Sequence, residues 1–261
     1  MSRVALVTGA ARGIGAATVR RLIADGWSVV AVDLCADDPA IPYALATRAE
    51  LEALRSLPGP GAVTPFIADV RDINALRQAV DLAVTTYGGL DAALAVAGVV
   101  GGGAPHWQTD PRTERAVLDI DLGGVLNLAR VAVPALLARP EPRSGRFVAV
   151  ASAAATRGLE RLAAYCAAKA GVTGFIRALA AELAGTGVTA TAVSPGSTAT
   201  AALAASADIY DLPDPQAFAA QQPHRRLLDP DEIAAAIVWL AGPDSSGLTG
   251  AAVPVDGGLS V

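Results

Sequence analysis

The chain has 261 residues, of which 52% are hydrophobic and 17% are charged, and its formal net charge at pH 7 is −5. This length fits one large α/β domain or two small ones, and the apolar fraction is enough to bury a large core. The acidic balance argues against a nucleic-acid binder or an anionic-membrane binder. No apolar run approaches the ~20 residues that cross a bilayer. Two cysteines and two histidines are too few for a disulfide framework or a metal cluster, so no metal is expected.

Short apolar runs alternate with amphipathic helical stretches along the chain. Strands are predicted at residues 4–7, 28–32, 62–67, 92–96, 146–150, 189–193 and 252–255. Helices are predicted between them at residues 15–25, 73–87, 111–137, 163–183 and 231–240. Repeated strand–helix–strand units of this kind predict a doubly wound α/β Rossmann fold, with a seven-stranded parallel sheet and helices on both faces. The chain begins in a strand with no signal-peptide cleavage pattern, so a cytoplasmic protein is expected.

Two segments interrupt this alternation. Residues 37–61 follow the second strand, contain four prolines and are longer than an ordinary crossover. Residues 199–226 follow the sixth strand and are rich in Ala, Gln, Asp and Pro. Long segments inside a compact domain are usually functional lids or disordered loops. We interpret the first as an insertion and the second as a substrate lid, with tolerated surface insertions as the alternative. No linker divides the chain, so residues 1–261 are predicted to form a single domain.

A glycine-rich turn follows the first strand and precedes a helix. Its sequence is TGAARGIG, residues 8–15. Glycines let the backbone approach a pyrophosphate, and a helix N-terminus offers free N–H groups at the positive end of its dipole. The strand–turn–helix context favours a dinucleotide site over a mere tight turn. The candidate contacts here are Gly9, Arg12, Gly13, Ile14 and Gly15.

An aspartate at the end of the second strand bears on the choice of cofactor. Asp33 can accept hydrogen bonds from both ribose hydroxyls of an adenosine, and its charge would repel a 2′-phosphate. Leu34 follows where a phosphate-binding arginine would otherwise stand, and Arg12 is the nearby cation that argues for NADP. The balance predicts NAD. Asp69 and Val70, after the third strand, are placed to hold the adenine amino edge, and a helix N-cap role for Asp69 is the open alternative.

The chain contains a single lysine, Lys169, four positions after Tyr165. Residues at this spacing share one face of a helix, so the ammonium is expected beside the phenol. A cation there stabilises the phenolate and lowers the tyrosine pKa toward neutrality, as a general acid/base requires. Lysine is a compact ammonium that the planar guanidinium of arginine does not replace. A surface lysine near a half-buried tyrosine is the alternative.

Together these motifs resemble the short-chain dehydrogenase/reductase family over essentially the whole chain. The matching residues are Gly9, Gly13, Gly15, Ser152, Tyr165, Lys169, Pro195, Gly196, Thr198, Thr200 and the closing sequence 256–258. The resemblance implies that Tyr165 exchanges a proton with the substrate oxygen and that Ser152 donates a hydrogen bond to that oxygen. It also implies that Lys169 holds the nicotinamide ribose and that Thr200 meets the carboxamide. Hydride would pass between the nicotinamide and the carbinol carbon, a chemistry that belongs to the cofactor.

The chain departs from the family pattern at two places. The usual Asn-Asn-Ala-Gly after the fourth strand reads Ala95-Val96-Ala97-Gly98, so bracing side-chain amides near the cofactor are missing. The asparagine expected in the fifth helix, which supports a water-mediated proton relay in the family, is Asp121. Its negative charge near Lys169 either tunes the tyrosine pKa or weakens the relay, and a solvated helix aspartate is the alternative.

Residues 33–52 resemble the insert of mycofactocin-associated short-chain dehydrogenases, although this insert is shorter than usual and has Arg48 where a proline often stands. The resemblance implies that the insert covers the adenine side of NAD, that the cofactor does not exchange freely, and that mycofactocin reoxidises it. The family also implies a homotetramer, for which the Ala-rich residues 163–183 would suit close packing.

The expected activity is the interconversion of a hydrophobic secondary alcohol and its ketone or aldehyde. Trp107, Leu159 and the lid are expected to line the substrate pocket. One alternative is an ordinary dehydrogenase with exchangeable NAD(P), in which the insert is decoration. The other is a non-catalytic nucleotide-binding scaffold, since a fold does not fix a function. The presence of Ser152, Tyr165 and Lys169 together favours an enzyme.

Overall fold

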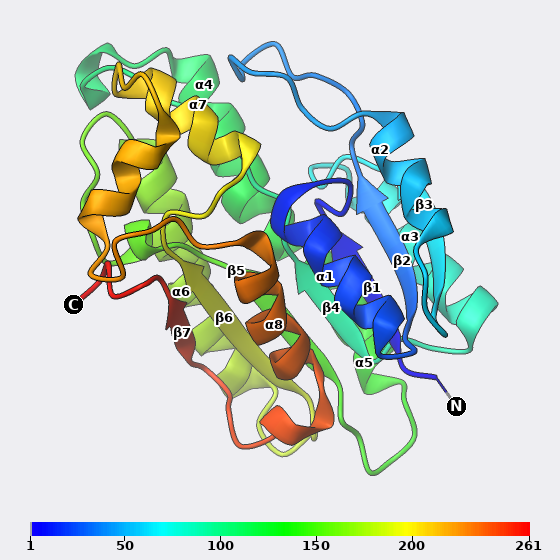
Figure 1. Cartoon of the computed structure of the whole chain (residues 1–261). Helices are drawn as coiled ribbons and strands as arrows, with labels where there is room; N and C mark the ends of the chain where they lie inside the picture. Colours follow the sequence, from blue (N-terminus) through cyan, green and yellow to red (C-terminus); the bar gives the residue numbers. More distant parts are fainter. Residues whose placement is uncertain (1) are drawn as a thin grey trace.

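A computed structural model describes residues 2–261 of the chain. Seven parallel strands form one sheet with the order β3-β2-β1-β4-β5-β6-β7 (Figure 1). The strands are β1 (Val4–Thr8), β2 (Ser28–Asp33), β3 (Ala62–Ile67), β4 (Ala92–Ala95), β5 (Arg146–Val150), β6 (Thr189–Pro195) and β7 (Ala252–Val255). Strand β1 pairs with both β2 and β4, so the direction of winding reverses between β1 and β4. A reversal of this kind leaves a crevice at the carboxyl ends of the strands, where doubly wound proteins bind ligands.

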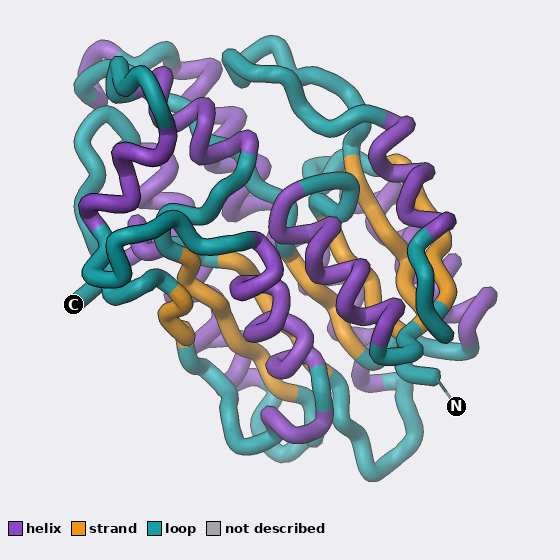
Figure 2. The backbone as a smooth tube through the Cα atoms, viewed as in Figure 1, coloured by secondary structure: helices purple, strands orange, loops and turns teal. Residues whose placement is uncertain are grey.

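Helices cover both faces of the sheet (Figure 2). They are α1 (Gly13–Ala24), α2 (Arg48–Ala53), α3 (Ile73–Tyr87), α4 (Pro111–Leu118), α5 (Gly124–Leu137), α6 (Ala163–Glu182), α7 (Ala201–Ile209) and α8 (Pro230–Ala241). Helices α1 and α8 pack together on one face, and α3, α5 and α6 lie on the other (Figure 1). The predicted single-sheet, doubly wound architecture is confirmed.

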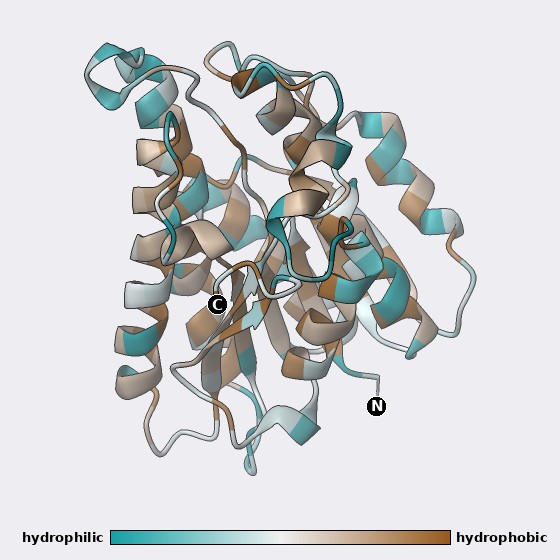
Figure 3. Cartoon of the chain, turned by 60° about the vertical axis from the view of Figure 1, so that its left-hand side comes forward, coloured by the Kyte–Doolittle hydropathy of each residue, from teal (hydrophilic) through white to brown (hydrophobic). Residues whose placement is uncertain are grey.

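The core consists of one apolar cluster on each face of the sheet. Leu6 of β1 belongs to the cluster under α3, α5 and α6, and its neighbour Val7 belongs to the cluster under α1 and α8. Both side chains are fully buried because a parallel strand is covered on both faces, which explains the continuous apolar runs in the sequence. Hydrophobic residues accordingly concentrate in the strands and in the helix faces toward them (Figure 3).

The predicted helix at residues 111–137 is divided in the structure. Helix α4 ends at Leu118, a π-helical turn η3 spans Asp119–Gly123, and α5 continues from Gly124. The stretch Pro111–Leu137 has the length and composition of a membrane span, the single case among residues 2–261. Its buried side chains pack against α3 and β4, as those of a core helix in a globular domain do. The π turn matters for the site because such turns change which side chains a helix directs inward.

The first part of the insertion, residues 37–47, and the lid lie at the carboxyl ends of the strands, whereas residues 57–61 return to the start of β3 beside Ile23 and Trp27. The insertion leaves β2 and includes α2, which begins with a capping box between Thr47 and Glu50. The lid leaves β6 and includes α7 and the 3₁₀ segment η5 (Pro215–Gln221). In Figure 1 both segments rise above the same edge of the sheet. The two irregular segments of the sequence therefore frame one site.

Candidate active site

Ser152, Tyr165 and Lys169 converge on one cavity of about 570 Å³ beyond the carboxyl ends of β5 and β6. Ser152 follows β5 in an extended conformation, and its hydroxyl accepts a hydrogen bond from the N–H of Ala154 at 3.1 Å. Tyr165 and Lys169 occupy the same face of α6, with the ammonium nitrogen 5.6 Å from the centroid of the phenol ring. The structure thus assembles the three residues that the sequence placed on separate elements.

Lys169 is fixed by contacts on three sides. Its Nζ donates to the carbonyl of Val150 at 3.2 Å and lies 3.4 Å from Oδ2 of Asp121. The other carboxylate oxygen, Oδ1, accepts from the N–H of Val99 at 2.8 Å. A side chain at Gly98 would bring its Cβ within 3.1 Å of Nζ, so glycine leaves the room that this pair occupies. Asp121 is fully buried, and the alternative of a solvated helix aspartate is therefore wrong.

Burial dominates the electrostatics of this cluster. Desolvation raises the pKa of Tyr165, and Asp121 adds to this rise, whereas Lys169 and a hydrogen bond from Ser152 lower it. Together these effects raise the pKa of Tyr165. The prediction that Lys169 lowers this pKa toward neutrality is therefore wrong for the phenol in its buried surroundings. Burial acts to lower the pKa of Lys169, but the negative charge of Asp121 and the coupling to Tyr165 outweigh it and raise that pKa. Burial raises the pKa of Asp121, opposed by Lys169 and the Val99 N–H.

The glycine-rich turn lies between β1 and α1. Gly9 has φ +66°, and a Cβ there would lie 2.6 Å from the Cα of Ala97. A Cβ at Gly15 would collide with the carbonyl oxygen of Gly9, so helix and strand approach each other closely. Helix α1 begins at Gly13, two residues before its predicted start, and no side chain among residues 2–261 caps it. Its first N–H groups are therefore free to bind phosphate oxygens.

A second cavity of about 190 Å³ extends from this turn toward the end of β2. It is lined by Gly9, Arg12, Gly13, Ile14, Gly15, Asp33, Leu34, Tyr43, Leu45, Ala46, Ala68, Asp69, Val70, Val96, Ala97, Gly98, Val99, Ile120, Thr200, Ala201 and Ala202. The catalytic cavity shares several of these residues, including Ile14, Gly98 and Thr200, so the two cavities form one groove. Pro195, Gly196 and Thr198 line its catalytic end. Ala95 lines neither cavity because it is buried as the last residue of β4.

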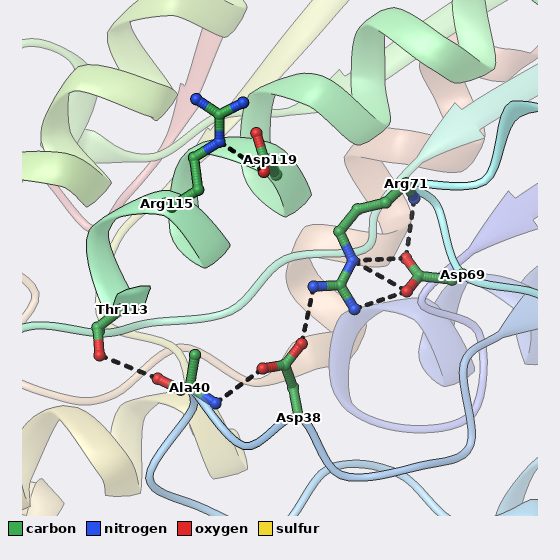
Figure 4. A network of polar contacts seen from close by, with 7 residues as sticks. All are labelled: Asp38, Ala40, Asp69, Arg71, Thr113, Arg115 and Asp119. Carbon is green, nitrogen blue, oxygen red and sulfur yellow. Dashed lines mark hydrogen bonds and ion pairs between the residues drawn. The ribbon is translucent and has the colours of Figure 1, made fainter. Parts of the chain in front are cut away.

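Asp33 and Asp69 occupy the far end of this groove. Asp33 Oδ2 accepts from the N–H of Ala11 at 2.9 Å, which ties the carboxylate to the glycine-rich turn. Asp69 forms a two-pronged ion pair with Arg71, which offsets burial and lowers the pKa of the carboxyl (Figure 4). The N-cap of α3 is Asp72, whose side chain accepts from the first-turn N–H groups, so the N-cap alternative for Asp69 is wrong.

Sequence reasoning missed some residues of the site. Thr8 Oγ1 accepts from the N–H groups of Val96 and Ala97 at 3.2 and 3.3 Å, and so braces the loop whose family amides are absent. Of the residues expected in the substrate pocket, Leu159 lines the cavity, whereas Trp107 is 82% exposed and does not. The lid contributes the unpredicted side chains Tyr210, Leu212, Phe218 and Gln221, and the insert contributes Tyr43 to the adjoining cavity.

The family model described as Enoyl-(Acyl carrier protein) reductase matches residues 9–260. The chain is 35% identical to (-)-trans-carveol dehydrogenase of Rhodococcus erythropolis, over 99% of this chain and 98% of the relative. It is 36% identical to cis-4-hydroxycyclohexanecarboxylate dehydrogenase of Sinomonas cyclohexanicum, over 99% of this chain and 96% of that one. The crystal structure of carveol dehydrogenase from Mycobacterium avium in complex with NAD has a TM-score of 0.91 at 29% identity, covering 98% and 97% of the two chains. By its sequence, its fold and the convergence of serine, tyrosine and lysine, the chain belongs to the short-chain dehydrogenase/reductase family of oxidoreductases.

Proposed function

We propose that this protein is an NAD-dependent dehydrogenase that interconverts a hydrophobic secondary alcohol and its ketone. One observation carries the proposal. Ser152, Tyr165 and Lys169 meet in a cavity that continues, through Gly98 and Thr200, into a groove ending at Asp33. Proton-transfer groups at one end and a dinucleotide-shaped groove at the other are what coupled proton and hydride transfer requires.

The residues of the cluster divide the work between them. In alcohol oxidation Tyr165 takes the hydroxyl proton as phenolate, and in ketone reduction it returns that proton as phenol. The hydroxyl of Ser152 accepts from Ala154 and has one proton to donate, which is expected to pass from the phenol oxygen to the substrate oxygen when substrate binds. Lys169, held by Val150 and Asp121, keeps a positive charge beside the phenol ring. Bound NAD supplies the hydride acceptor at its nicotinamide ring.

The preference for NAD over NADP follows from Asp33. Its carboxylate lines the adenosine end of the groove, where it can accept from the two ribose hydroxyls. A 2′-phosphate would place a second negative charge beside it. A nearby Arg12 could offset that charge, but its guanidinium is engaged with the carbonyl of Ala44 at 2.9 Å. The preference for NAD is therefore expected to be strong.

The substrate side of the cavity is mainly apolar. Its apolar lining includes Val100, Leu159, Leu162, Leu203, Leu212 and Phe218. Tyr210 and Phe218 of the lid stack edge to face at 6.0 Å, which gives this wall a defined shape. Two relatives are named for dehydrogenation of carveol and of a hydroxycyclohexanecarboxylate, which supports a cyclic alcohol as the substrate class, and the apolar lining favours a hydrophobic one.

Four polar contacts hold the insert against the rest of the domain beside the cofactor groove. Asp38 pairs with Arg71 at 2.8 Å, and Thr113 of α4 donates to the carbonyl of Ala40 at 3.1 Å (Figure 4). Arg12 of the glycine-rich turn holds Ala44, and the N–H of Val100 donates to the Tyr43 hydroxyl at 3.0 Å. These contacts join the insert to four separate segments of the domain. Because Tyr43, Leu45 and Ala46 of the insert line the adenosine part of the groove, we infer that NAD dissociates slowly and that an electron carrier such as mycofactocin reoxidises it in place.

We also propose a homotetramer built on the outward face of α6. That face is exposed and consists mainly of small residues, namely Ala163, Ala167, Ala170, Gly174, Ala178 and Ala181. Small side chains allow two helices to approach closely, so the same face of a second copy would fit it. Light scattering or analytical ultracentrifugation measures the assembly directly, and a monomer at micromolar concentration would remove this part of the proposal.

The test of the function begins with the purified protein as isolated. Denaturation and chromatography of the released small molecules should give close to one NAD(H) per chain. The protein should oxidise hydrophobic secondary alcohols with an artificial electron acceptor and reduce little external NAD. A variant shortened between Asp37 and Pro60 should lose the cofactor and exchange NAD with solution, whereas Trp107→Ala, at an exposed side chain outside the lining of both cavities, should behave as the parent. A protein that purifies without cofactor and reduces external NAD at ordinary rates would be a dehydrogenase with an exchangeable cofactor. The proposal that mycofactocin reoxidises the bound cofactor would then be rejected.

A further inference from the structure

The buried cluster contains a carboxylate, Asp121, beside the lysine that serves the catalytic tyrosine. We propose that Asp121 is a positioning residue whose negative charge sets the pH at which Tyr165 transfers a proton. Its charge compensates that of the Lys169 ammonium. Alcohol oxidation therefore requires a higher pH than it would with an uncharged side chain at this position. The effect on alcohol oxidation rests on the proposed function. The effect of Asp121 on the ionisation of Tyr165 does not.

The geometry separates the charge of Asp121 from its hydrogen bonding. Oδ1 accepts from the N–H of Val99 at 2.8 Å, a contact that a side-chain amide oxygen would make equally well. Oδ2 is buried, faces Nζ of Lys169 at 3.4 Å, and has no hydrogen-bond partner among residues 2–261. The π turn η3 directs this oxygen into the interior. What distinguishes the aspartate from an amide is therefore its negative charge against the ammonium.

Few other charges act on this pair. Helices α4, α5 and α6 pack against η3, and the insert approaches it through Tyr43. The titratable groups that face Asp121 are Lys169 and Tyr165 from α6 and Tyr43 from the insert. The remaining charged residues on these helices and on η3 are exposed or paired near the surface, namely Arg112, Glu114, Arg115, Asp119, Arg130, Arg177 and Glu182. The buried cluster thus has one cation and one anion, and its formal charge is zero while the phenol is protonated.

The sign of the effect follows from this balance. A lone ammonium beside a phenol favours the phenolate, but an adjacent carboxylate cancels much of that attraction and repels the phenolate itself. The ionisations of Asp121, Lys169 and Tyr165 are coupled. Tyr165 therefore loses its proton against the negative charge of Asp121. Alcohol oxidation needs the phenolate, so the pH at which its rate rises is shifted upward. Ketone reduction needs the phenol, which stays protonated over a wider range of pH.

The kinetic test replaces the carboxylate by its amide. In Asp121→Asn the rising limb of kcat/KM for alcohol oxidation should move to lower pH by about one unit or more, as the loss of a charge at this range in a buried site predicts. Asp119→Asn is the matched control, because it removes the same charge from the same turn at an exposed carboxylate paired with Arg115. Its pH profile should stay in place. A folded Asp121→Asn enzyme with an unshifted limb would overturn the proposal, since a merely structural role lowers kcat without moving the pH profile.

A second measurement does not depend on turnover. Ultraviolet titration of tyrosinate in the parent, minus that in Tyr165→Phe, reports the ionisation of Tyr165 with Asp121 in place. In protein saturated with NADH, whose nicotinamide ring is uncharged, Tyr165 should ionise above the usual tyrosine pKa of about 10. The same difference measured in the Asp121→Asn background should give ionisation at lower pH, and an unchanged ionisation of Tyr165 would sink the inference. If no alcohol is turned over, the proposed function fails while this titration still decides the role of Asp121.

Discussion

The hydroxyl of Tyr43 accepts a hydrogen bond from the backbone N–H of Val100 at 3.0 Å, across 57 residues of sequence. Tyr43 lines the adenosine part of the groove and also packs against the apolar cluster of Val100, Leu162 and Ala205 beside the catalytic cavity. One side chain of the insert therefore contacts both the cofactor groove and the substrate wall. We therefore expect a change at Tyr43 to affect both the release of the cofactor and the shape of the substrate pocket.

Tyr43→Phe should accelerate release of NAD(H) several-fold while leaving the fold intact. The ring keeps its packing, but the N–H of Val100 loses its partner, a change that costs about 1–3 kcal/mol for a buried group. Release is measured by diluting the loaded protein into a scavenger that consumes free NADH. Tyr87→Phe is the control, because it removes a hydrogen bond to Thr64 on the far part of the domain. Equal release from both variants would show that Tyr43 does not fasten the insert.

Tyr165→Phe should reduce turnover by about 10²–10⁴-fold, the usual contribution of general acid/base catalysis. The phenyl ring preserves the packing on α6, so cofactor content should match that of the parent. Steady-state rates with a confirmed alcohol, together with NAD(H) content of the same preparation, measure both effects. Near-parental turnover would remove Tyr165 from the mechanism.

Lys169→Arg should be severely impaired although it conserves the charge. Lys169 is 3% exposed and lies between Asp121, Val150 and the space left open by Gly98, where the wider guanidinium does not fit. A planar fork also cannot replace a point ammonium against both a phenol and a ribose. Rates and thermal unfolding of the variant are compared with those of Arg177→Lys, the reverse exchange on the exposed face of the same helix. Full activity of Lys169→Arg would mean that any cation serves at this position.

Asp33→Asn should relax the preference for NADH over NADPH by at least about tenfold. The amide still accepts from the N–H of Ala11, so the glycine-rich turn keeps its brace, while the charge facing a 2′-phosphate disappears. Repulsion between two like charges a few Å apart in a partly buried site amounts to several kcal/mol at low effective dielectric. Fluorescence titration of cofactor-free protein with each nucleotide measures the ratio. A parent protein that binds both nucleotides equally would contradict the role of Asp33.

Gly9→Ala should destabilise the protein more than Gly88→Ala does and should abolish cofactor binding. Both glycines have positive φ, +66° and +82°, so both alanines carry backbone strain of about 1 kcal/mol. Only at Gly9 does the added Cβ also meet backbone, 2.6 Å from the Cα of Ala97, whereas nothing lies within 4 Å at Gly88. Urea unfolding of the two variants separates the cost of backbone strain from the cost of the contact between the added Cβ and Ala97. Equal losses of unfolding free energy would show that the glycine-rich turn moves to accommodate the added Cβ.

Local sequence signals determined the elements and their order. The helix predicted at residues 73–87 is α3, because Asp72 caps its first turn and Gly88 ends it in the left-handed conformation. The central strands, such as β1 and β4, were predictable from their apolar runs, since strands buried on both faces favour apolar side chains throughout. Tyr165 and Lys169 were predictable as neighbours because their spacing places them on one face of a helix, and their convergence with Ser152 was implied by the resemblance to the short-chain dehydrogenase/reductase family.

Only the tertiary structure decided how these residues are surrounded. Whether Asp121 is solvated or buried depends on a π turn inside a helix that the periodicity predicts as continuous. The upward shift of the Tyr165 pKa depends on desolvation, which is a property of everything packed around the phenol rather than of the spacing to Lys169. Trp107 points to solvent and Tyr43 reaches Val100 because of contacts between segments far apart in the chain. Such contacts have no local signature, so hydrophobic pattern and motif spacing could not predict them.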